Sequence, residues 1–518
     1  MKRRHFIKTT TAAAVAVPLV LNGMPLQAFE KSGMYASLDN NNDRILVLIQ
    51  LNGGNDGLNM IVPIDQYSKL VDARSNIILP ENSILKLTDQ TGIHPSMPGM
   101  KTLFDNAKLN VVQNVGYPDQ NRSHFRSTDI WTSASSAEEV ITSGWLGRYF
   151  DSKYPGYPDG YPNTDCTDPF AITVGSLVSE TCQGTSANFS LAILDPTSLF
   201  QLNEGSGGNP DLTTCYGMEL SFLRSALLQT NAYINVINNA NTSGTNLSTY
   251  PSQNSLADQL KTVARLIAGG LKTKVYITSL GGFDTHAKQV DTADTTTGPH
   301  AMLLQQISEA VKAFQDDISA HGLEEKVIGM TFSEFGRQIK SNDSDGTDHG
   351  TAAPLFLFGS CVKAGVFGNN PIIPANIADQ EGVAMSVDFR SVYGTILKDW
   401  FKMDTNDIDK ILFNQWQYLA LLKDCTTAAF DPTVPVIDVN IYPNPVESTG
   451  YIEFNTEDEW TRISIFNALG FEIKVLSDQR FISGKHKVAF RMDNFPAANY
   501  YIRIQTKYLS ITKAFVKI

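Results

Sequence analysis

The stretch Arg44-Ile-Leu-Val-Leu-Ile-Gln-Leu51, followed directly by Asn52-Gly53-Gly54, decides the fold class. A continuous apolar run that ends in a glycine turn is typical of a strand in a parallel sheet, because helices cover both faces of such a sheet. The same pattern recurs three times along the chain. The further predicted strands are Leu109–Val115, which ends at Gly116; Val275–Leu280, which ends at Gly281-Gly282; and Val327–Phe332, which ends at Ser333-Glu334.

Helical patterns alternate with these strands. The expected helices are Met97–Asn106, Met218–Ile237, Ser255–Leu271 and Met302–His321. Alternating strands and helices predict an α/β fold with a doubly wound, mostly parallel sheet over about residues 43–430. Ligands bind such sheets outside the carboxyl ends of the strands, so the polar residues that follow each strand are the candidate site.

Residues 151–216 interrupt this pattern with a segment rich in tyrosine, proline and glycine. We expect an insertion over the edge of the sheet. The segment holds three of the five cysteines, Cys166, Cys182 and Cys215. Two of these three can pair in an oxidising compartment, and the sequence leaves open which two. No Cys-x-x-Cys pair occurs, which excludes a zinc ribbon and a thioredoxin-like motif.

Composition excludes other classes of protein. Of the 518 residues, 42% are hydrophobic and 18% are charged, against about 25% charged in typical soluble domains. These fractions predict a globular chain without a long charged tail. The 41 Lys and Arg against 53 Asp and Glu give a net charge of -12. This balance disfavours nucleic acid as a partner, since non-specific binding of nucleic acid needs a basic surface.

The N-terminus reads Met1-Lys-Arg-Arg-His-Phe-Ile-Lys8 and continues into the apolar run Thr11–Leu21. That run is shorter than the roughly 20 residues of a membrane span. Ala28 offers a small residue for cleavage, so residues 1–28 are predicted to be a signal peptide. The adjacent arginines resemble the twin-arginine export signal, which implies export of the folded chain by the twin-arginine translocon. The alternative is a chance basic N-terminus.

The C-terminal region, about residues 437–518, shows a different pattern. Alternating apolar and polar residues at Tyr451–Phe454, Arg462–Phe466, Lys487–Phe490 and Tyr500–Ile504 predict a small antiparallel β-sandwich. Residues 436–518 hold 10 Lys and Arg and 9 Asp and Glu, a net charge of +1 in a chain of -12. This change of composition predicts a domain boundary near residues 431–437.

Two polar clusters follow the first two strands. The first, Asn52-Gly-Gly-Asn-Asp-Gly-Leu-Asn59, carries one carboxylate, Asp56, in a glycine-rich turn that lets the backbone approach a ligand. The second, Asn121-Arg-Ser-His-Phe-Arg-Ser127, combines two arginines, a histidine and two serines, which suits an oxyanion contact and a general base. The alternatives are an ordinary turn aspartate and a helix N-terminus capped by Ser123.

Two further clusters follow the later strands. In Gly281-Gly-Phe-Asp-Thr-His286, extended backbone places Asp284 and His286 on one face, where both can bind one ion. The last cluster runs from Ser333-Glu-Phe-Gly-Arg337 to Gly346-Thr-Asp-His-Gly350. It supplies Glu334, Asp348 and His349, with a polar surface turn as the alternative.

Together the four clusters predict a metal centre at one edge of the sheet. Carboxylates and imidazoles in this number fit one or two divalent ions, with zinc, manganese and calcium as candidates. No nucleophile elbow, P-loop, HExxH or dinucleotide motif is present. The predicted ligands are Asp56, Asp284, His286, Glu334, Asp348 and His349.

These strings, together with Ile93-His-Pro95, Gly144-Trp-Leu-Gly-Arg148 and Val387-Asp-Phe-Arg390, resemble the bacterial family catalogued as domain of unknown function 1501 over about residues 43–425. That family is similar in fold to the alkaline phosphatase and sulfatase superfamily. The resemblance implies metals at strand ends and hydrolysis of phosphate or sulfate esters. The chain departs from the superfamily pattern at Ser333-Glu334, where the superfamily has Asp-His, and it lacks the Cys-x-Pro-x-Arg signature of sulfatases.

The C-terminal segment resembles the sorting domain of the type IX secretion system. The matching features are Tyr442-Pro-Asn-Pro445, Ile463–Phe466 leading to Gly470, and Asn499-Tyr-Tyr-Ile-Arg503. The resemblance implies a Bacteroidetes-type bacterium, the type IX machinery as a partner, and delivery to the cell surface or the medium. The alternative is an ordinary immunoglobulin-like binding module.

The resulting hypothesis is a secreted, metal-dependent hydrolase of small anionic esters. In it Ser123, the candidate nucleophile, or a metal-bound hydroxide attacks the ester, His124 assists proton transfer, and Arg122, Arg126 and Arg337 hold ester oxygens.

The alternative hypothesis is a non-catalytic protein that binds a surface glycan or matrix. Tyr154–Tyr161, Trp131 and Trp145 would then stack on sugar rings. A packed aromatic loop is the interpretation that we favour for these residues.

Overall fold

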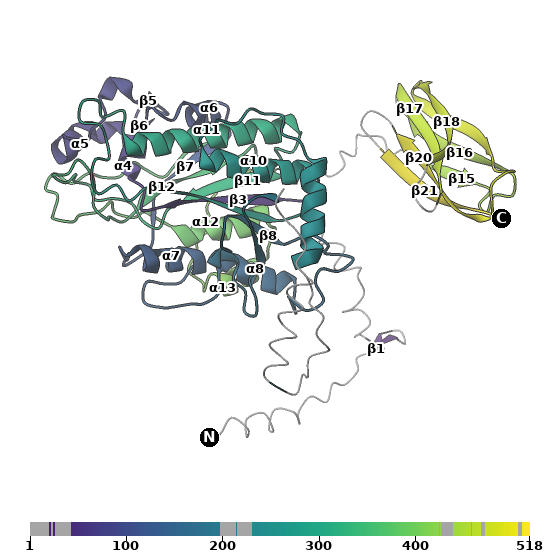
Figure 1. Cartoon of the computed structure of the whole chain (residues 1–518), viewed down its shortest axis with the longest axis horizontal. Helices are drawn as coiled ribbons and strands as arrows, with labels where there is room; N and C mark the ends of the chain where they lie inside the picture. The colour runs from purple at the N-terminus through teal and green to yellow at the C-terminus, as the bar shows by residue number, and fades with distance from the viewer. Residues whose placement is uncertain are drawn as a thin grey trace. The chain divides into compact units, whose positions relative to one another are not determined.

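The computed structural model describes residues 43–196, 214, 230–423, 425, 439–456, 458–467, 472–505 and 510–518, with two short strands, β1 (Val20–Leu21) and β2 (Met24–Pro25). It divides into two units, Met1–Cys425 and Thr426–Ile518 (Figure 1). We call them the α/β unit and the C-terminal unit. The predicted signal peptide, apart from β1 and β2, lies outside the described residues, as do Cys215 and the predicted boundary at 431–437.

A nine-stranded sheet forms the centre of the α/β unit. Its strands are β3 (Ile45–Asn52), β7 (Leu109–Gly116), β8 (Ala171–Val174), β9 (Ser190–Ile193), β10 (Val275–Gly281), β11 (Val327–Phe332), β12 (Ala353–Phe358), β13 (Gly365–Phe367) and β14 (Val387–Asp388). The order is β13-β7-β12-β11-β3-β10-β8-β9, and β14 also pairs with β7. Only the pairs that β12 makes with β11 and β7 are antiparallel. The predicted α/β class and its four strands are confirmed.

Helices cover both faces of this sheet (Figure 1), and β3 shows why its sequence is apolar throughout. Along β3, Ile45, Val47 and Ile49 belong to one buried cluster, whereas Leu46 and Leu48 belong to another. The first cluster packs against α6 (Pro98–Asp105), α10 (Ser255–Ala268) and α11 (Pro299–Ala320). The second packs against α7 (His124–Ser133), α8 (Trp145–Lys153), α12 (Phe389–Thr395) and α13 (Thr405–Ile411). Successive side chains of a strand face opposite sides of the sheet, so β3 is buried on both faces.

Three of the four predicted helices are confirmed as α6, α10 and α11. The fourth, Met218–Ile237, enters the described residues only at residue 230, and residues 230–243 are helical.

A smaller layer lies between β3 and α6 in the sequence. Its elements are α4 (Gly57–Met60), β4 (Ile61–Pro63), η1 (Ile64–Gln66), α5 (Tyr67–Arg74), η2 (Glu81–Ser83), β5 (Leu85–Lys86) and β6 (Thr91–Ile93). The three strands form one small sheet. Its side chains share a buried cluster with Ile339 and Val383, which lie in the loops that follow β11 and precede β14. The layer therefore supports the loops at the carboxyl edge of the main sheet.

The segment 151–216 is less separate from the sheet than predicted, because its strands β8 and β9 extend the sheet beyond β10. A short helix, η3 (Glu180–Cys182), lies between them. The tyrosines pack inward: Tyr154 stacks on Phe170 with ring centroids 3.9 Å apart, and Tyr157 stacks on Phe189 at 4.2 Å. Trp131 and Trp145 are 3% and 1% exposed. These two indoles therefore cannot stack on a sugar, which corrects that part of the binding hypothesis.

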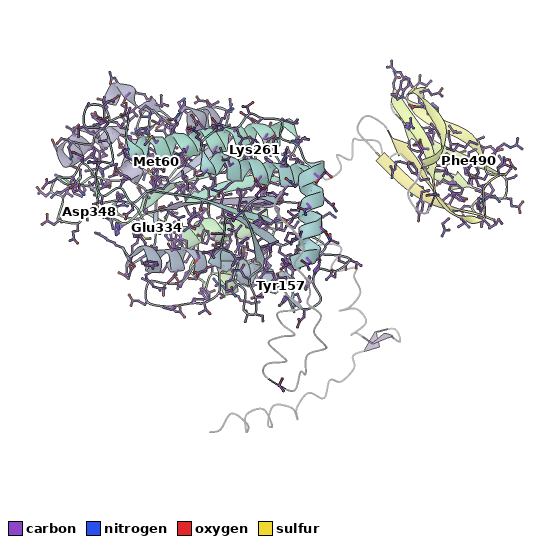
Figure 2. All side chains as sticks on the ribbon, in the orientation of Figure 1. Met60, Tyr157, Lys261, Glu334, Asp348 and Phe490 are labelled. Carbon is purple, nitrogen blue, oxygen red and sulfur yellow. A yellow bond between two sulfur atoms is a disulfide. The ribbon has the colours of Figure 1, made fainter. Side chains whose placement is uncertain are left out.

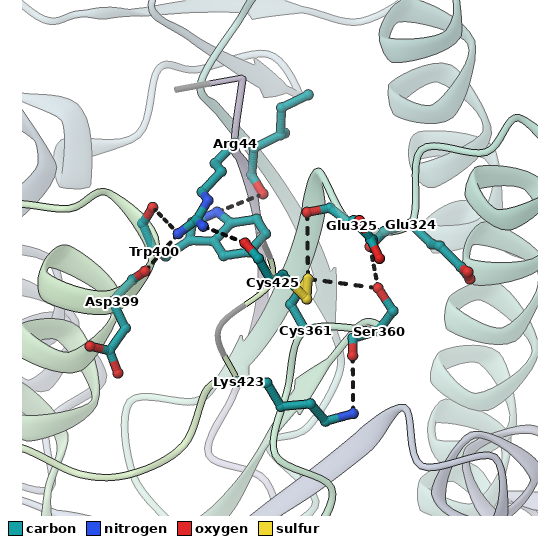
Figure 3. Close-up of a disulfide and its surroundings, with 10 residues drawn as sticks. Arg44, Glu324, Glu325, Ser360, Cys361, Asp399, Trp400, Lys423 and Cys425 are labelled. Carbon is teal, nitrogen blue, oxygen red and sulfur yellow. Dashed lines mark hydrogen bonds between the residues drawn. A yellow bond between two sulfur atoms is a disulfide. The ribbon is translucent and has the colours of Figure 1, made fainter. Parts of the chain in front are cut away.

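One disulfide, Cys361–Cys425, joins residues that are 64 positions apart (Figure 3). The expected pairing within 151–216 is wrong for Cys166 and Cys182, whose thiols are free. Proximity along the chain misled that prediction, since Cys361 follows β12 and meets the last residue of the α/β unit. Arg44 strengthens this junction by donating to the carbonyl oxygen of Cys425 at 2.6 Å. It also donates to the carbonyl of Trp400, at the end of the π-helix η5 (Ile396–Trp400).

The C-terminal unit is all β, as predicted. One sheet contains β15 (Asn440–Tyr442), β16 (Thr449–Thr456) and β19 (Gly484–Arg491), and the other contains β17 (Glu459–Phe466), β18 (Glu472–Phe481), β20 (Ala498–Gln505) and β21 (Ser510–Lys517). All pairings within these sheets are antiparallel. A single buried cluster fills the unit. Among the described residues of the whole chain, no helix has the length and apolar character of a membrane span.

Candidate metal centre

The predicted polar clusters meet at one edge of the sheet. Strands β3, β7, β10 and β11 run in the same direction, so the loops that follow them emerge at the same edge. Strand β12 is antiparallel to β11, so the loop between them both leaves and re-enters the sheet at that edge. Figure 2 shows Glu334 and Asp348 on the same side of the α/β unit. The topology thus gathers residues from four loops, those that follow β3, β7, β10 and β11.

Three histidines surround Asp284, and we call these four residues the imidazole cluster. The Nε2 atoms of His286 and His349 lie 3.0 and 3.1 Å from Oδ1 of Asp284 and 2.9 Å from each other. Nε2 of His124 lies 3.5 Å from Oδ2 of Asp284. Ligand atoms of His124, Asp284 and His349 all fall within 4.8 Å of one another. Ligand atoms of these three residues therefore lie close enough to share one ion, and His286 borders them through Asp284 and His349.

The outer nitrogen of the His349 ring, Nδ1, fixes its tautomer. It lies 2.9 Å from the carbonyl oxygen of Arg122. A carbonyl can only accept, so Nδ1 of His349 carries the hydrogen. In a neutral imidazole the other nitrogen then holds a lone pair. Burial lowers the pKa of His349 below its usual value, although hydrogen bonds with Asp284 and the Arg122 carbonyl act in the other direction. His349 therefore directs a lone pair at Asp284.

Carboxylates play the same part for the other two rings. Nδ1 of His286 lies 2.8 Å from Oδ1 of Asp348, and Nδ1 of His124 lies 2.8 Å from Oε1 of Glu334. An ionised carboxylate accepts, so both Nδ1 atoms donate. The neutral forms of all three rings therefore direct Nε2 lone pairs towards Asp284. Acceptors that face one another at 2.9–3.1 Å repel unless a cation lies between them or a ring carries a second proton on Nε2.

Glu334 and Asp348, both predicted as metal ligands, each accept a hydrogen bond from the outer nitrogen of a histidine of the cluster. Glu334 is buried and also accepts from the backbone N–H of Gly53 at 2.8 Å. Asp348 accepts from the side-chain amide of Asn342 at 3.2 Å. Carboxylates that hold the outer nitrogen of a histidine are common around metal sites, where they fix the orientation of the ring.

Arg337 is buried and holds Asp284 in place. Its guanidinium donates to Oδ1 of Asp284 at 2.7 Å and to the backbone carbonyls of Gly53, Gly54, Phe283 and Thr347. Burial raises the pKa of Asp284, but its contacts with Arg337 and His349 and the charge of Arg337 outweigh burial and lower that pKa to about 2. Asp284 is therefore ionised near neutral pH. Arg337 therefore holds this carboxylate from its buried side.

Asp56 lies away from this arrangement. It is 1% exposed and accepts from Arg74 at 2.9 and 3.1 Å and from Gln289 at 2.7 Å. Burial raises the pKa of Asp56, but the Arg74 charge and these hydrogen bonds leave it below its usual value. Among the described residues, no hydrogen bond joins Asp56 to the imidazole cluster. Asp56 is instead the partner of a buried arginine from α5.

The segment after β7 contributes in several ways. Arg122 donates to the carbonyl of His349 at 3.1 Å. Arg126 donates to the carbonyls of Ser136, Ala137 and Glu139, which lie beyond the end of α7. Ser123 is exposed and precedes α7, but its hydroxyl makes no capping hydrogen bond. The predicted cap is thus absent, and this hydroxyl lies next in sequence to His124.

Sequence reasoning missed Phe335 and the structural role of Gly54. The Phe335 ring lies 4.9 and 4.7 Å from the rings of His124 and His349. Gly54 has φ +75°, and a Cβ there would meet the Phe335 ring at 2.2 Å. The paired glycines of the first cluster were the available signal, since they permit this close approach.

Fold and site define a two-unit protein: an α/β unit with a histidine and aspartate centre, and a β-sandwich tail. A family model described as "Protein of unknown function (DUF1501)" matches residues 242–412. A model described as "Secretion system C-terminal sorting domain" matches residues 440–518. Both resemblances are confirmed. The sorting domain indicates type IX secretion and export to the cell surface or the extracellular space. No curated protein matches the chain.

Solved structures with similarity to the chain share little sequence with it. A protein in the alkaline phosphatase superfamily from Vibrio parahaemolyticus is 10% identical, with 80% of this chain and 76% of that chain covered and a TM-score of 0.33. The phosphonate monoester hydrolase SpPMH from Silicibacter pomeroyi is 10% identical, with 91% and 89% covered and a TM-score of 0.33. PorZ of the type IX secretion system of Porphyromonas gingivalis is 12% identical, and the chain spans 13% of its length with a TM-score of 0.12.

Proposed function

We propose that this protein is a secreted, metal-dependent hydrolase of phosphate or sulfate esters. The observation that supports the proposal most directly is the convergence of three Nε2 atoms on the Asp284 carboxylate, each ring held by an acceptor at its outer nitrogen. In this proposal residues 1–28 direct folded export through the twin-arginine translocon. The C-terminal unit then directs passage across the outer membrane.

The imidazole cluster fits a divalent metal ion by the chemistry of its donors. His124, His286, His349 and Asp284 would hold the ion. Three nitrogens and one oxygen suit zinc or manganese, whereas calcium prefers oxygen ligands throughout. A bound divalent ion supplies a Lewis acid that polarises a phosphoryl or sulfuryl oxygen and offsets developing negative charge.

The other residues of the edge orient and support the reacting groups. Glu334, Asp348 and the Arg122 carbonyl fix the three rings, and Arg337 fixes Asp284. The exposed Ser123 hydroxyl is the candidate nucleophile. It stands at the N-terminal end of α7, where free backbone N–H groups and the helix dipole favour an anionic group.

Elemental analysis of the purified full-length protein tests the metal. We expect stoichiometric zinc or manganese in the wild type and in His486→Ala, a histidine of the C-terminal unit, and loss of the metal in Asp284→Ala/His349→Ala. Hydrolysis of 4-nitrophenyl phosphate and 4-nitrophenyl sulfate should be lost in the same double variant. A folded wild type that binds neither metal would refute the proposal. Metal without hydrolysis of either ester would leave a metal site and reject the hydrolase.

The Ser123→Ala variant tests the nucleophile separately. We expect metal content to stay as in the wild type, because Ser123 is not a member of the imidazole cluster. Ester hydrolysis should fall by about 100-fold or more if the hydroxyl attacks. Unchanged hydrolysis would assign the attack to water.

A further inference from the structure

A cleft of about 960 Å³ lies beside the β7 end of the sheet, formed by β13, β14 and the segment 414–419. It shares no residue with the imidazole cluster. Its volume falls at the top of the range of roughly 300–1,000 Å³ that small-molecule sites occupy. The cleft is therefore large enough for an organic ligand, and its lining indicates which kind.

Carboxamide side chains dominate the polar lining of the cleft. Three of them make no side-chain hydrogen bond with another described residue and are exposed to solvent: Asn369, Asn414 and Gln417. A carboxamide both donates and accepts, as a hydroxyl does, so such groups pair well with sugar hydroxyls. The full set is Asn114, Asn369, Asn370, Asn414, Gln415 and Gln417.

The cleft is electrically neutral. Its only two ionisable lining residues, Asp388 and Arg390, form an ion pair with N···O distances of 2.5 and 2.8 Å. Arg390 is 4% exposed and also donates to the Gln415 carboxamide. The lining leaves no unpaired cation for a phosphate, a sulfate or a nucleotide, since such anions need charge-assisted contacts. A neutral, polar ligand fits best.

A fixed aromatic ring adds the apolar part of the lining. The indole N–H of Trp416 donates to Asp409 at 2.8 Å, which sets the ring orientation. The ring packs on Gly394, where any Cβ would sit 2.2 Å from an indole carbon. Ile372 lies on the same lining and is 80% exposed. Aromatic rings with polar neighbours suit ligands that have both C–H faces and hydroxyls.

The backbone of β7 is irregular where it borders the cleft. Asn114 has φ +52°, and the register between β7 and β12 shifts between Ala353 and Leu355. The side chain of Asn114 donates to the carbonyl of Asn369 at 3.0 Å and so ties the bulge to the loop after β13. Bulges that redirect a side chain are frequent near binding sites. The irregular end of β7 thus holds Asn114 and the loop after β13 together at the border of the cleft.

We propose that this cleft binds a neutral oligosaccharide, with Trp416 as the stacking platform and the free carboxamides of Asn414, Gln417 and Asn369 as partners of its hydroxyls. The site is separate from the imidazole cluster and does not depend on the proposed hydrolase activity. It replaces the aromatic segment 154–161 as the place where this protein contacts a glycan.

Affinity electrophoresis of the full-length protein tests the proposal. Native gels contain soluble starch, xylan, galactomannan or laminarin as neutral probes, and carrageenan as an anionic probe. We expect at least one neutral polysaccharide to retard the wild type. Asn414→Ala/Gln417→Ala should bind about tenfold more weakly through the loss of two hydrogen bonds, and Trp416→Ala should lose retardation.

Matched controls separate this cleft from the rest of the surface. Asn239→Ala/Gln305→Ala removes two exposed carboxamides from helices outside the cleft, and Asp284→Ala/His349→Ala disrupts the imidazole cluster; both should be retarded like the wild type. Because Trp416→Ala removes a buried contact with Gly394, the exposed pair Asn414→Ala/Gln417→Ala decides the outcome. The proposal is overturned if no neutral polysaccharide retards the wild type, if only carrageenan does, or if the exposed pair leaves retardation unchanged.

Discussion

The Cys361–Cys425 disulfide fastens the end of the α/β unit to the loop after β12, and its removal gives a quantitative prediction. Cys361→Ser/Cys425→Ser leaves the native contacts nearly intact but frees the unfolded chain. The crosslink closes a loop with a sequence separation of 64. Loop-closure entropy for that length amounts to about 4 kcal/mol at 25 °C. We therefore expect the double variant to lose up to about 4 kcal/mol of stability.

Urea unfolding followed by helical circular dichroism measures this loss, because the helices of the described residues all belong to the α/β unit. With a denaturant slope of about 3 kcal/mol per molar, the midpoint should fall by about 1 M urea. A reductant should shift the wild-type midpoint to the same value. The C-terminal unit, which holds neither cysteine, should unfold as before.

Cys166→Ser is the matched control, since Cys166 is a free, half-buried thiol of the same unit. Its midpoint should stay within about 0.2 M of the wild type, as expected for a mild change at a partly exposed position. The reasoning is refuted if the double variant and the wild type unfold at the same midpoint, or if reductant has no effect on the wild type.

Three further predictions follow from buried groups. Arg74→Met leaves the Asp56 carboxylate buried without its cation and should cost about 3–5 kcal/mol, measured by urea unfolding. Burial lowers the pKa of His300 to about 4 despite the nearby Asp56, so the folded state disfavours protonation of this ring. The contribution of His300 to stability is therefore complete above its unfolded pKa of about 6.5 and falls as the pH drops from there towards 4. Urea midpoints measured across that pH range should show this fall. Gly54→Ala places a Cβ against the Phe335 ring at a backbone φ of +75° and should lower metal content in elemental analysis.

Each of these has a control or a contrary outcome. The exposed ion pair of Lys410 with Asp407 provides the comparison for Arg74, because water screens such a pair and Lys410→Met should leave the urea midpoint close to that of the wild type. A pH slope that persists in His300→Gln would assign it to another group. Gly156→Ala is the control for Gly54, since Gly156 also has a positive φ but a Cβ added there would have no atom within 4 Å. Equal metal content in all three proteins would contradict the role of Gly54.

Much of the sheet was predictable because its central strands are buried on both faces. Such strands, β3 among them, read as unbroken apolar runs, and their glycine ends mark the turns. Strands β8 and β9 were missed because each has four residues, too few for a clear period. The direction of β12 was equally hidden, since an antiparallel strand within a parallel sheet has no sequence signature of its own.

The candidate site could be located from the sequence but not assembled from it. Strand-end placement gathers Asp284, His286, Glu334 and His349 at one edge, as predicted. What each residue does depends on the direction of its side chain, which the sequence does not give. The Glu334 carboxylate, for example, faces the outer nitrogen of His124 and not Asp284. Asp56 has the same strand-end position, but Arg74, 18 residues further along the chain, lies within hydrogen-bond distance and pairs with it.

The hydrogen bond from Arg44 to the carbonyl of Cys425 has a consequence for modularity. It places Arg44, the residue before β3, beside Cys425, the last residue of the α/β unit, so the described part of that unit from residue 43 onward begins and ends at one spot. A domain whose ends are neighbours can be inserted into a loop of another protein, or its ends can be joined and new ones opened elsewhere, without breaking its sheet. We therefore expect the α/β unit to fold when it is joined to C-terminal segments other than the one it has here.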